Sequence, residues 1–208
     1  MRAKWLEERK SGIGGSDAAA IMGVSPYMDT ITLWEIKTGK RREPEVSNPY
    51  VQYGIEAEAH IAALFALNNP TLLVHTSEYE ILTHAEYSFI CGTLDGEFTD
   101  TEGNKGVLEV KTSRILSGQM RAKWDNRIPQ HYYIQLLHYL LVTGYKMAAL
   151  QAYLLTNLDN RNVMGETREY WIDADTIKDD LDSLLERELW FWRFVETDTK
   201  PPIILPKL

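Results

Sequence analysis

The sequence predicts an α/β protein in which a mixed central β-sheet is flanked by helices. Stretches with helical spacing and helix-capping residues lie on both sides of a block of β-branched and aromatic segments. Two more strands and a last amphipathic helix complete the chain. Helices interspersed with strands in this order cover the faces of one sheet, whereas a helical bundle or a β-sandwich would not contain both patterns.

Two short helices are expected near the start of the chain. The segment 14–17, Gly-Gly-Ser-Asp, precedes an alanine-rich stretch that ends at Gly23, which predicts a helix capped by Gly15 or Ser16. A second short helix is expected over residues 31–38.

Two long helices are predicted from clear boundary signals. Asn48 and Pro49 are a favourable cap and first-turn pair, and the apolar spacing after them continues until just before Asn68. The other long helix covers about 129–143, where Gly144 ends it.

β-branched and aromatic residues mark five strands, at residues 71–83, 87–99, 106–112, 147–155 and 167–172. The first three are separated by polar turns, such as 101–104, and are expected to be adjacent and antiparallel. Asp173 or Asp175 then caps a last amphipathic helix that reaches about residue 195.

Length and composition predict one domain over residues 1–208, because 208 residues of which 44% are apolar can bury one core. The single cysteine, Cys91, excludes an internal disulfide framework and an iron–sulfur cluster, and fits a reducing cytoplasm. No apolar run reaches the ~20 residues of a membrane span, and the first ten residues lack the apolar stretch of a secretory signal. We therefore expect a protein of the cytoplasm without membrane contact.

The net charge of −8, from 22 Lys and Arg against 30 Asp and Glu, is only a weak objection to nucleic acid. A nuclease can gather its basic residues in one groove, and carboxylates that bind metal make the total more negative. Basic residues do cluster here near the start, at 37–42 and at 111–127, whereas 173–188 is strongly acidic. A solvated face is the ordinary explanation of any one such cluster.

The most informative segment is 91–114, CGTLDGEFTDTEGNKGVLEVKTSR. Side chains two apart on a strand share a face, so Glu109 and Lys111 project together while Val110 turns toward the core. A turn near Gly103 would bring Asp95 alongside Glu109. Two carboxylates and the Val110 carbonyl would then offer three oxygens to one hard cation, for which Mg²⁺ is the natural occupant.

A magnesium ion at this place suits phosphodiester cleavage, because it polarises the phosphate and lowers the pKa of a bound water. Lys111 can stabilise the transition state or help to remove the proton of the water, and the sequence leaves both roles open. Glu-x-Lys also occurs by chance in a chain that is 25% charged. Glu35 and Lys37 have the same spacing, but they lie in a predicted helix, where residues two apart do not face each other.

The chain resembles the PD-(D/E)xK nuclease superfamily, and more narrowly the lambda-exonuclease-type phage recombination exonucleases, or YqaJ-like alkaline exonucleases. The residues that carry the resemblance follow in one order from 5 to 144: Trp5, Arg9, Gly15-Ser16-Asp17, Tyr53-Gly54, Glu58, Leu94-Asp95-Gly96, Leu108-Glu109-Val110-Lys111, Tyr133, Gln135 and His138. Leu94 stands where the superfamily label has proline, which is not a ligand. Residues 145–208, with the last strands and helix, add no motif.

The resemblance implies a restriction-endonuclease-like core and assigns roles to further residues. Glu58 would be an extra carboxylate beside the metal, and Gln135 would hydrogen-bond the water or phosphate. A 5′-phosphate pocket would contain Arg9, Ser16, Thr93 and Arg114, although the spacing of Arg114 from Lys111 departs from the family pattern. An ordinary helix cap is the competing explanation for Ser16, and His131 and His138 are better explained as core residues than as ligands.

As a function, the resemblance implies a Mg²⁺-dependent 5′ to 3′ exonuclease that digests one strand of linear duplex DNA to 5′ mononucleotides, with Mn²⁺ as a possible substitute. It further implies a ring-shaped homotrimer, a single-strand annealing protein as partner in recombination, and a phage or prophage gene expressed in a bacterial cytoplasm. Two alternatives stay open, a structure- or sequence-specific endonuclease and a non-catalytic DNA-binding recombination subunit.

If Arg9 receives a terminal phosphate, Arg9→Ala should slow digestion of 5′-phosphorylated duplex ends while 5′-hydroxyl ends are digested as before, because only the former lose an ion pair. The measurement is digestion of the two end-labelled duplexes side by side. Equal loss on both ends would contradict the pocket.

Overall fold

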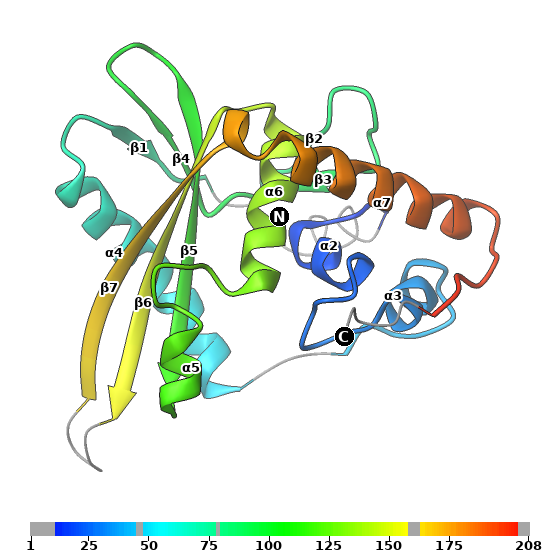
Figure 1. Cartoon of the computed structure of the whole chain (residues 1–208), viewed down its shortest axis with the longest axis horizontal. Coiled ribbons are helices and arrows are strands. Elements are labelled where there is room, and N and C mark those ends of the chain that lie inside the picture. Colours follow the sequence, from blue (N-terminus) through cyan, green and yellow to red (C-terminus); the bar gives the residue numbers. More distant parts are fainter. Residues whose placement is uncertain (1–10, 45–47, 78–79, 158–162, 204–208) are drawn as a thin grey trace.

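The computed structural model describes residues 11–44, 48–77, 80–157 and 163–203. A five-stranded sheet in the order β1-β4-β5-β6-β7 lies at its centre (Figure 1). The strands are β1 (Leu73–His75), β4 (Gly96–Thr99), β5 (Lys105–Ile115), β6 (Met147–Asn157) and β7 (Val163–Asp173). β5 and β6 run parallel and the other three pairings are antiparallel, which confirms the predicted mixed sheet.

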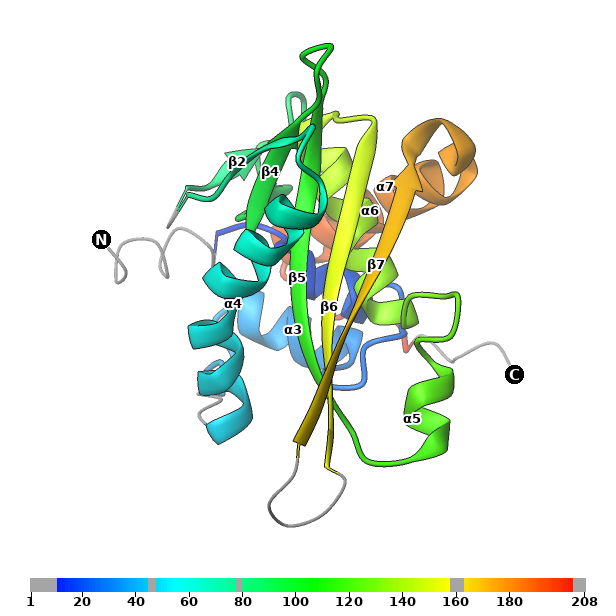
Figure 2. The same cartoon turned by 90° about the vertical axis from the view of Figure 1, so that its left-hand side faces the viewer.

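Helices cover both faces of this sheet (Figure 2). On one face lies α4 (Pro49–Asn68), whose buried Phe65 packs in one apolar cluster with Val110 of β5. On the other face lies α6 (Gln130–Thr143), whose buried Leu136 belongs to a cluster with inward-facing residues of β5 and β6. The predicted α/β architecture with flanking helices is therefore confirmed.

A second layer of helices lies outside α6, on the right of Figure 1. It consists of α2 (Gly15–Ile21), α3 (Thr30–Lys37) and α7 (Lys178–Glu196). Their apolar side chains form one cluster that includes Ile21, Trp34 and Phe191. This layer holds the amino-terminal helices against the face of the sheet that α6 covers.

The boundaries of the two long helices are confirmed. The Asn48 side chain accepts hydrogen bonds from the backbone amides of Tyr50 and Val51, which caps α4. Gly144, at a φ of +66°, ends α6 in the left-handed conformation that glycine adopts without strain.

Two predicted helix caps are wrong. Gly14, rather than Gly15 or Ser16, precedes α2, because the Asp17 carboxylate accepts the Gly14 amide at 2.9 Å and fixes the start one residue earlier. Asp173 caps only a short 3₁₀ helix, η1 (Ala174–Thr176), by accepting the amide of Asp175, and α7 begins later.

The extended strands predicted over 71–83 and 87–99 are also wrong, because each is broken. The first contains β1 and β2 (Leu82–Thr83), and the second contains β3 (Cys91–Gly92) and β4. β2 and β3 pair in a small separate sheet, since the chain turns between β3 and β4 to bury Leu94 against the α6 side of the core. A short helix that the sequence did not predict, α5 (Gly118–Ala122), follows β5 and is capped by Ser117.

Among the residues that the structure places, no helix has the length and apolar character that crossing a membrane requires.

A buried ion pair fixes α6 to the second layer. His138 on α6 contacts the Glu188 carboxylate of α7 through Nδ1 at 2.7 Å, and its Nε2 lies 2.9 Å from the Cys91 carbonyl oxygen. Both side chains are fully buried. Burial alone would lower the pKa of His138, but the Glu188 carboxylate and the Cys91 carbonyl raise it above its usual value. The expectation that His138 is a hydrogen-bonded core residue is therefore confirmed.

His138→Leu and Glu188→Leu should each lower the free energy of unfolding by about 3–5 kcal/mol, because either change leaves one buried charge without its partner. The double variant should lose clearly less than the two single losses together. Denaturant unfolding at pH 7 measures all three. Lys178→Ala, which removes an exposed ion pair on the same helix, is the control and should leave stability almost unchanged. Additive losses in the double variant would contradict a paired interaction.

Candidate active site

The register of β4 and β5 brings the two predicted acidic residues together. Gly96 at the start of β4 is opposite Leu108 on β5, so that Asp95 comes next to Glu109. The Asp95 carboxylate accepts the backbone amide of Val110 at 2.9 Å. Asp95 is therefore fixed just before β4 begins, at the point beyond which β4 no longer pairs with the edge of β5.

Glu109 and Lys111 share one face of β5, as the alternation of a strand predicts. Lys111 Nζ is bonded to Glu109 Oε1, while Val110 is buried on the α4 side. Glu109 has no exposed surface, and among the described residues its Oε2 has no hydrogen-bond partner. Burial and the nearby Asp95 raise the pKa of Glu109 to about 8, against the opposing effect of Lys111.

One face of α6 covers this pair with aromatic side chains. The Lys111 ammonium lies 5.5 Å from the ring centre of Tyr132. One turn on, Gln135 donates its amide to the Tyr139 hydroxyl at 2.9 Å. Burial, with Glu109 and Asp95 nearby, raises the pKa of Tyr139, so this hydroxyl stays protonated. The structure thus places Gln135 beside Tyr139, on the face of α6 that is turned toward Glu109 and Lys111.

Sequence reasoning did not identify Tyr132 or Tyr139 as part of the site. Their spacing from Gln135 could have identified them, because residues three and four apart lie on one face of a helix. Tyr133, which carries part of the family motif, instead donates to the Asp180 carboxylate of α7 at 2.6 Å. It therefore lies on the face of α6 that is turned away from β5.

The oxygen donors fit a magnesium ion. A buried carboxylate oxygen without a partner is costly unless a cation or a donor approaches it, and Glu109 Oε2 is such an atom. In the described residues, no three Asp, Glu, His or Cys side chains are placed so that together they could hold a metal ion. Mg²⁺ commonly binds to one or two carboxylates and fills its other positions with water and phosphate oxygens. Asp95 and Glu109 supply that number, and the Val110 carbonyl stays a predicted third donor.

Glu58 approaches the same site from α4. It is half-buried, and its charge contributes to the raised pKa of Glu109. The Glu58 carboxylate therefore acts on the Glu109–Lys111 pair. Among the described residues, however, it does not form with Asp95 and Glu109 a group of three that could hold one metal ion.

The residues predicted to bind a 5′ phosphate are only partly brought together. Ser16 is exposed in the first turn of α2, next to Gly15, where an added Cβ would lie 2.7 Å from the Tyr139 ring. Thr93 lies between β3 and β4, two residues before Asp95. Thr93 is thus close in sequence to Asp95, whereas Ser16 is linked to the site only through the contact of its neighbour Gly15 with Tyr139.

Arg114 lies elsewhere. It is on the same face of β5 as Val110, where its guanidinium donates to the Tyr50 hydroxyl at 2.9 Å and to the Asn157 side chain at 3.0 Å. Arg9 lies outside the described residues, and its predicted role stays a prediction.

Comparisons with known proteins identify the family and the fold. Residues 4–146 match the model of the family described as the YqaJ-like viral recombinase domain. The uncharacterized protein YqaJ of Bacillus subtilis (strain 168) is 30% identical over 192 residues, which are 92% of this chain and 55% of YqaJ. The chain thus spans little more than half the length of that relative.

Three solved structures of two exonucleases share the fold. The alkaline exonuclease LHK-Exo from Laribacter hongkongensis has a TM-score of 0.66 at 16% identity, over 94% of this chain and 93% of its own. The same enzyme in complex with dAMP gives a TM-score of 0.64 at 17% identity with the same coverage. A phage related exonuclease from Haemophilus somnus 129PT gives 0.56 at 15% identity, over 90% of this chain and 96% of its own.

If Asp95 and Glu109 hold a divalent cation, millimolar Mg²⁺ should raise the melting temperature of the wild-type protein, because a ligand that binds only the folded state stabilises it. Asp95→Ala and Glu109→Ala should abolish that rise. Glu35→Ala removes the acid of the other Glu-x-Lys sequence and should leave the rise intact. A rise that persists without both Asp95 and Glu109 would place the cation elsewhere.

Proposed function

The chain belongs to the family of YqaJ-like viral recombinase domains, and from this we propose that it is a Mg²⁺-dependent exonuclease. Its substrate would be one strand of linear double-stranded DNA, digested from 5′ to 3′ into 5′ mononucleotides. The remaining 3′ single strand would serve homologous recombination by annealing. The observation that carries the proposal is the convergence of Asp95, Glu109 and Lys111 at the open edge of β5.

Phosphodiester hydrolysis needs a nucleophilic water, a polarised phosphate and stabilisation of the charge that develops. When bound, Mg²⁺ supplies the polarisation and lowers the pKa of water. Asp95 and Glu109 would hold it. The ion would then neutralise the buried Glu109 carboxylate together with Lys111, whose ammonium is bonded to that carboxylate.

Lys111 can contribute charge or accept a proton. Its ammonium is bonded to Glu109, and the neighbouring carboxylates raise its pKa against the opposing effect of burial. In this state it is protonated, which favours the role of stabilising negative charge on the phosphate over that of a base. Gln135, one helix turn from Tyr132, can donate to a phosphate oxygen or orient water without adding charge.

The choice of an exonuclease over an endonuclease rests on family membership and on the shared fold of the alkaline exonucleases. The dAMP complex of LHK-Exo supports release of a mononucleotide. By the same reasoning we propose a homotrimeric ring, a single-strand annealing protein as partner, and Mn²⁺ as a substitute for Mg²⁺. We also propose that the protein is encoded by a phage or prophage gene and acts in the cytoplasm of a bacterial host.

The deciding experiment follows end-labelled linear duplex and closed circular DNA over time, with and without Mg²⁺. The expected result is loss of the linear substrate from its 5′ ends, release of mononucleotides, intact circles and no turnover in EDTA. Cleavage of the circles would identify an endonuclease. DNA binding without metal-stimulated turnover would identify a non-catalytic subunit.

Asp95→Ala, Glu109→Ala and Lys111→Ala should each lower the rate of digestion by at least about 100-fold, because each removes a group that acts on the reacting phosphate or its metal. Initial rates on the linear duplex are the measurement, with circular dichroism to show that the variants fold. Glu35→Ala should digest as the wild type does. A folded Lys111→Ala variant with wild-type activity would exclude this site.

A further inference from the structure

A cleft of about 430 Å³ lies beside the catalytic residues but contains none of them. It is lined by the loop before α3, the segment after β5 and the first turn of α6, including Pro26, Lys123, Arg127, Gln130 and His131. None of its lining residues in the described part of the chain is acidic. In a protein with a net charge of −8, this absence marks the cleft as a place for an anion.

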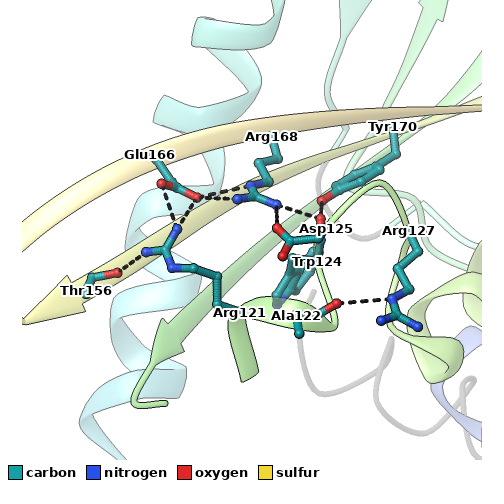
Figure 3. A network of polar contacts seen from close by, with 9 residues as sticks. All are labelled: Arg121, Ala122, Trp124, Asp125, Arg127, Thr156, Glu166, Arg168 and Tyr170. Carbon is teal, nitrogen blue, oxygen red and sulfur yellow. Dashed lines mark hydrogen bonds and ion pairs between the residues drawn. The ribbon is translucent and has the colours of Figure 1, made fainter. Parts of the chain in front are cut away.

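The wall of the cleft that carries Lys123 and Arg127 is rigidly anchored (Figure 3). Arg121 contacts Glu166 of β7 at 2.9 Å and the Thr156 hydroxyl of β6 at 2.8 Å. Arg168 of β7 bonds the Asp125 carboxylate at 2.7 Å. These ion pairs neutralise their members and fix the segment to the sheet.

The two cations of the cleft take no part in that network. Arg127 lies apart from it in Figure 3, where its Nε donates to the Ala122 carbonyl at 3.0 Å. Lys123 and Arg127 are both exposed. A guanidinium held through Nε presents its remaining N–H groups to a ligand, which suits a phosphate.

An exposed tyrosine ring stands at the border of the cleft: Tyr27 is not a lining residue, but it follows the lining residue Pro26 and contacts the lining residue His131. Tyr27 is 80% exposed, and its backbone is fixed because the Ser25 hydroxyl accepts the amides of Tyr27 and Met28 at 3.2 and 3.3 Å. Its ring stands edge-on to His131, with centroids 5.9 Å apart at 85°. A pre-positioned and exposed aromatic ring can stack on a nucleobase at little cost in conformational entropy.

A chain of ring contacts leads from this tyrosine to the catalytic lysine. The ring centroids of His131 and Tyr132 lie 3.9 Å apart, and the Tyr132 centroid lies 5.5 Å from Lys111 Nζ. Burial and the cations Lys123 and Lys111 lower the pKa of His131, so that it is neutral near pH 7. The cleft therefore borders the site within the length of a few side chains.

We propose that this cleft binds an unpaired segment of the DNA strand next to the scissile phosphate, with a base stacked on Tyr27 and phosphates at Lys123 and Arg127. The inference rests on the proposed function, since it assumes a DNA substrate. An unpaired strand is favoured over duplex because a base inside a helix already has both faces covered by its neighbours. Aromatic rings interleaved with cations are typical of single-strand binding.

Binding without metal separates this inference from the proposed function. Fluorescence anisotropy in EDTA would measure the affinity of the full chain for labelled dT12 and for a blocked hairpin duplex. Tyr27→Ala should weaken dT12 binding about 10-fold and hairpin binding far less. Tyr27→Phe keeps the ring and should bind dT12 within about two-fold of the wild type.

The proposed phosphate contacts of Lys123 and Arg127 are tested by how the affinity for dT12 depends on salt concentration. Lys123→Ala and Arg127→Ala should each reduce the slope of log affinity against log salt concentration for dT12 by about 0.7, the value for one phosphate contact on a single strand. Lys178→Ala on α7 is the matched control and should leave the slope unchanged.

Unchanged dT12 affinity in Tyr27→Ala, or unchanged slopes in both cation variants, would overturn the proposal. An equal loss on dT12 and hairpin would overturn the assignment to an unpaired strand. Failure of the proposed function would instead appear as an absence of Mg²⁺-dependent turnover by wild-type protein that still binds DNA.

Discussion

The pairing register of β4 and β5 is the constraint on which the candidate site depends. Side chains alternate along a strand, so a slip of one residue would move Glu109 and Lys111 to the α4 face and expose Val110 in their place. The turn between the strands sets this register. The Asp100 carboxylate accepts the amides of Glu102 and Asn104 at 2.8 and 2.9 Å, and Gly103 adopts a φ of +88°. The ring of Phe98 also covers Gly106, its partner across the strands, where a Cβ would clash.

With the register fixed, the site contains carboxylates that repel one another, and apolar packing on both faces of the sheet offsets this repulsion. The Glu109 carboxylate is buried next to Asp95, with Glu58 adding to the repulsion. The parallel pairing of β5 with β6 runs on from Gly106 to Ile115 and holds Glu109 and Lys111 in place. Apolar clusters on both faces of the sheet supply the burial that keeps this strand rigid. A cation that binds between these carboxylates would reduce their repulsion. The stability of the folded protein should therefore increase when the cation is bound.

The sequence predicted the parts of the fold that depend on local signals. Asn48 and Gly144 mark the start of α4 and the end of α6 as predicted, because helix capping depends on a few neighbouring residues. Asp95, Glu109 and Lys111 could be placed together from a strand period of two and one turn. The break between β3 and β4 could not be predicted, because it depends on Leu94 reaching a core that distant segments build. The role of Tyr132 was hidden for the same reason, since only packing shows which side of a helix faces the sheet.

α6 unites these features because each of its faces serves a different purpose. Tyr139, with Gln135 bonded to it, lies near Glu109 and Lys111 of β5, while His138 joins the buried pair that fixes the helix to α7. Its first turn, with His131, forms part of the cleft. A rotation of the helix that improved one of these contacts would disturb the other two. The buried His138–Glu188 pair opposes such a rotation, because separating the two groups would leave each of them buried without the partner that it contacts at 2.7 Å. The His138–Glu188 pair, which is not part of the candidate site, thus helps to hold Gln135 and Tyr139 in place.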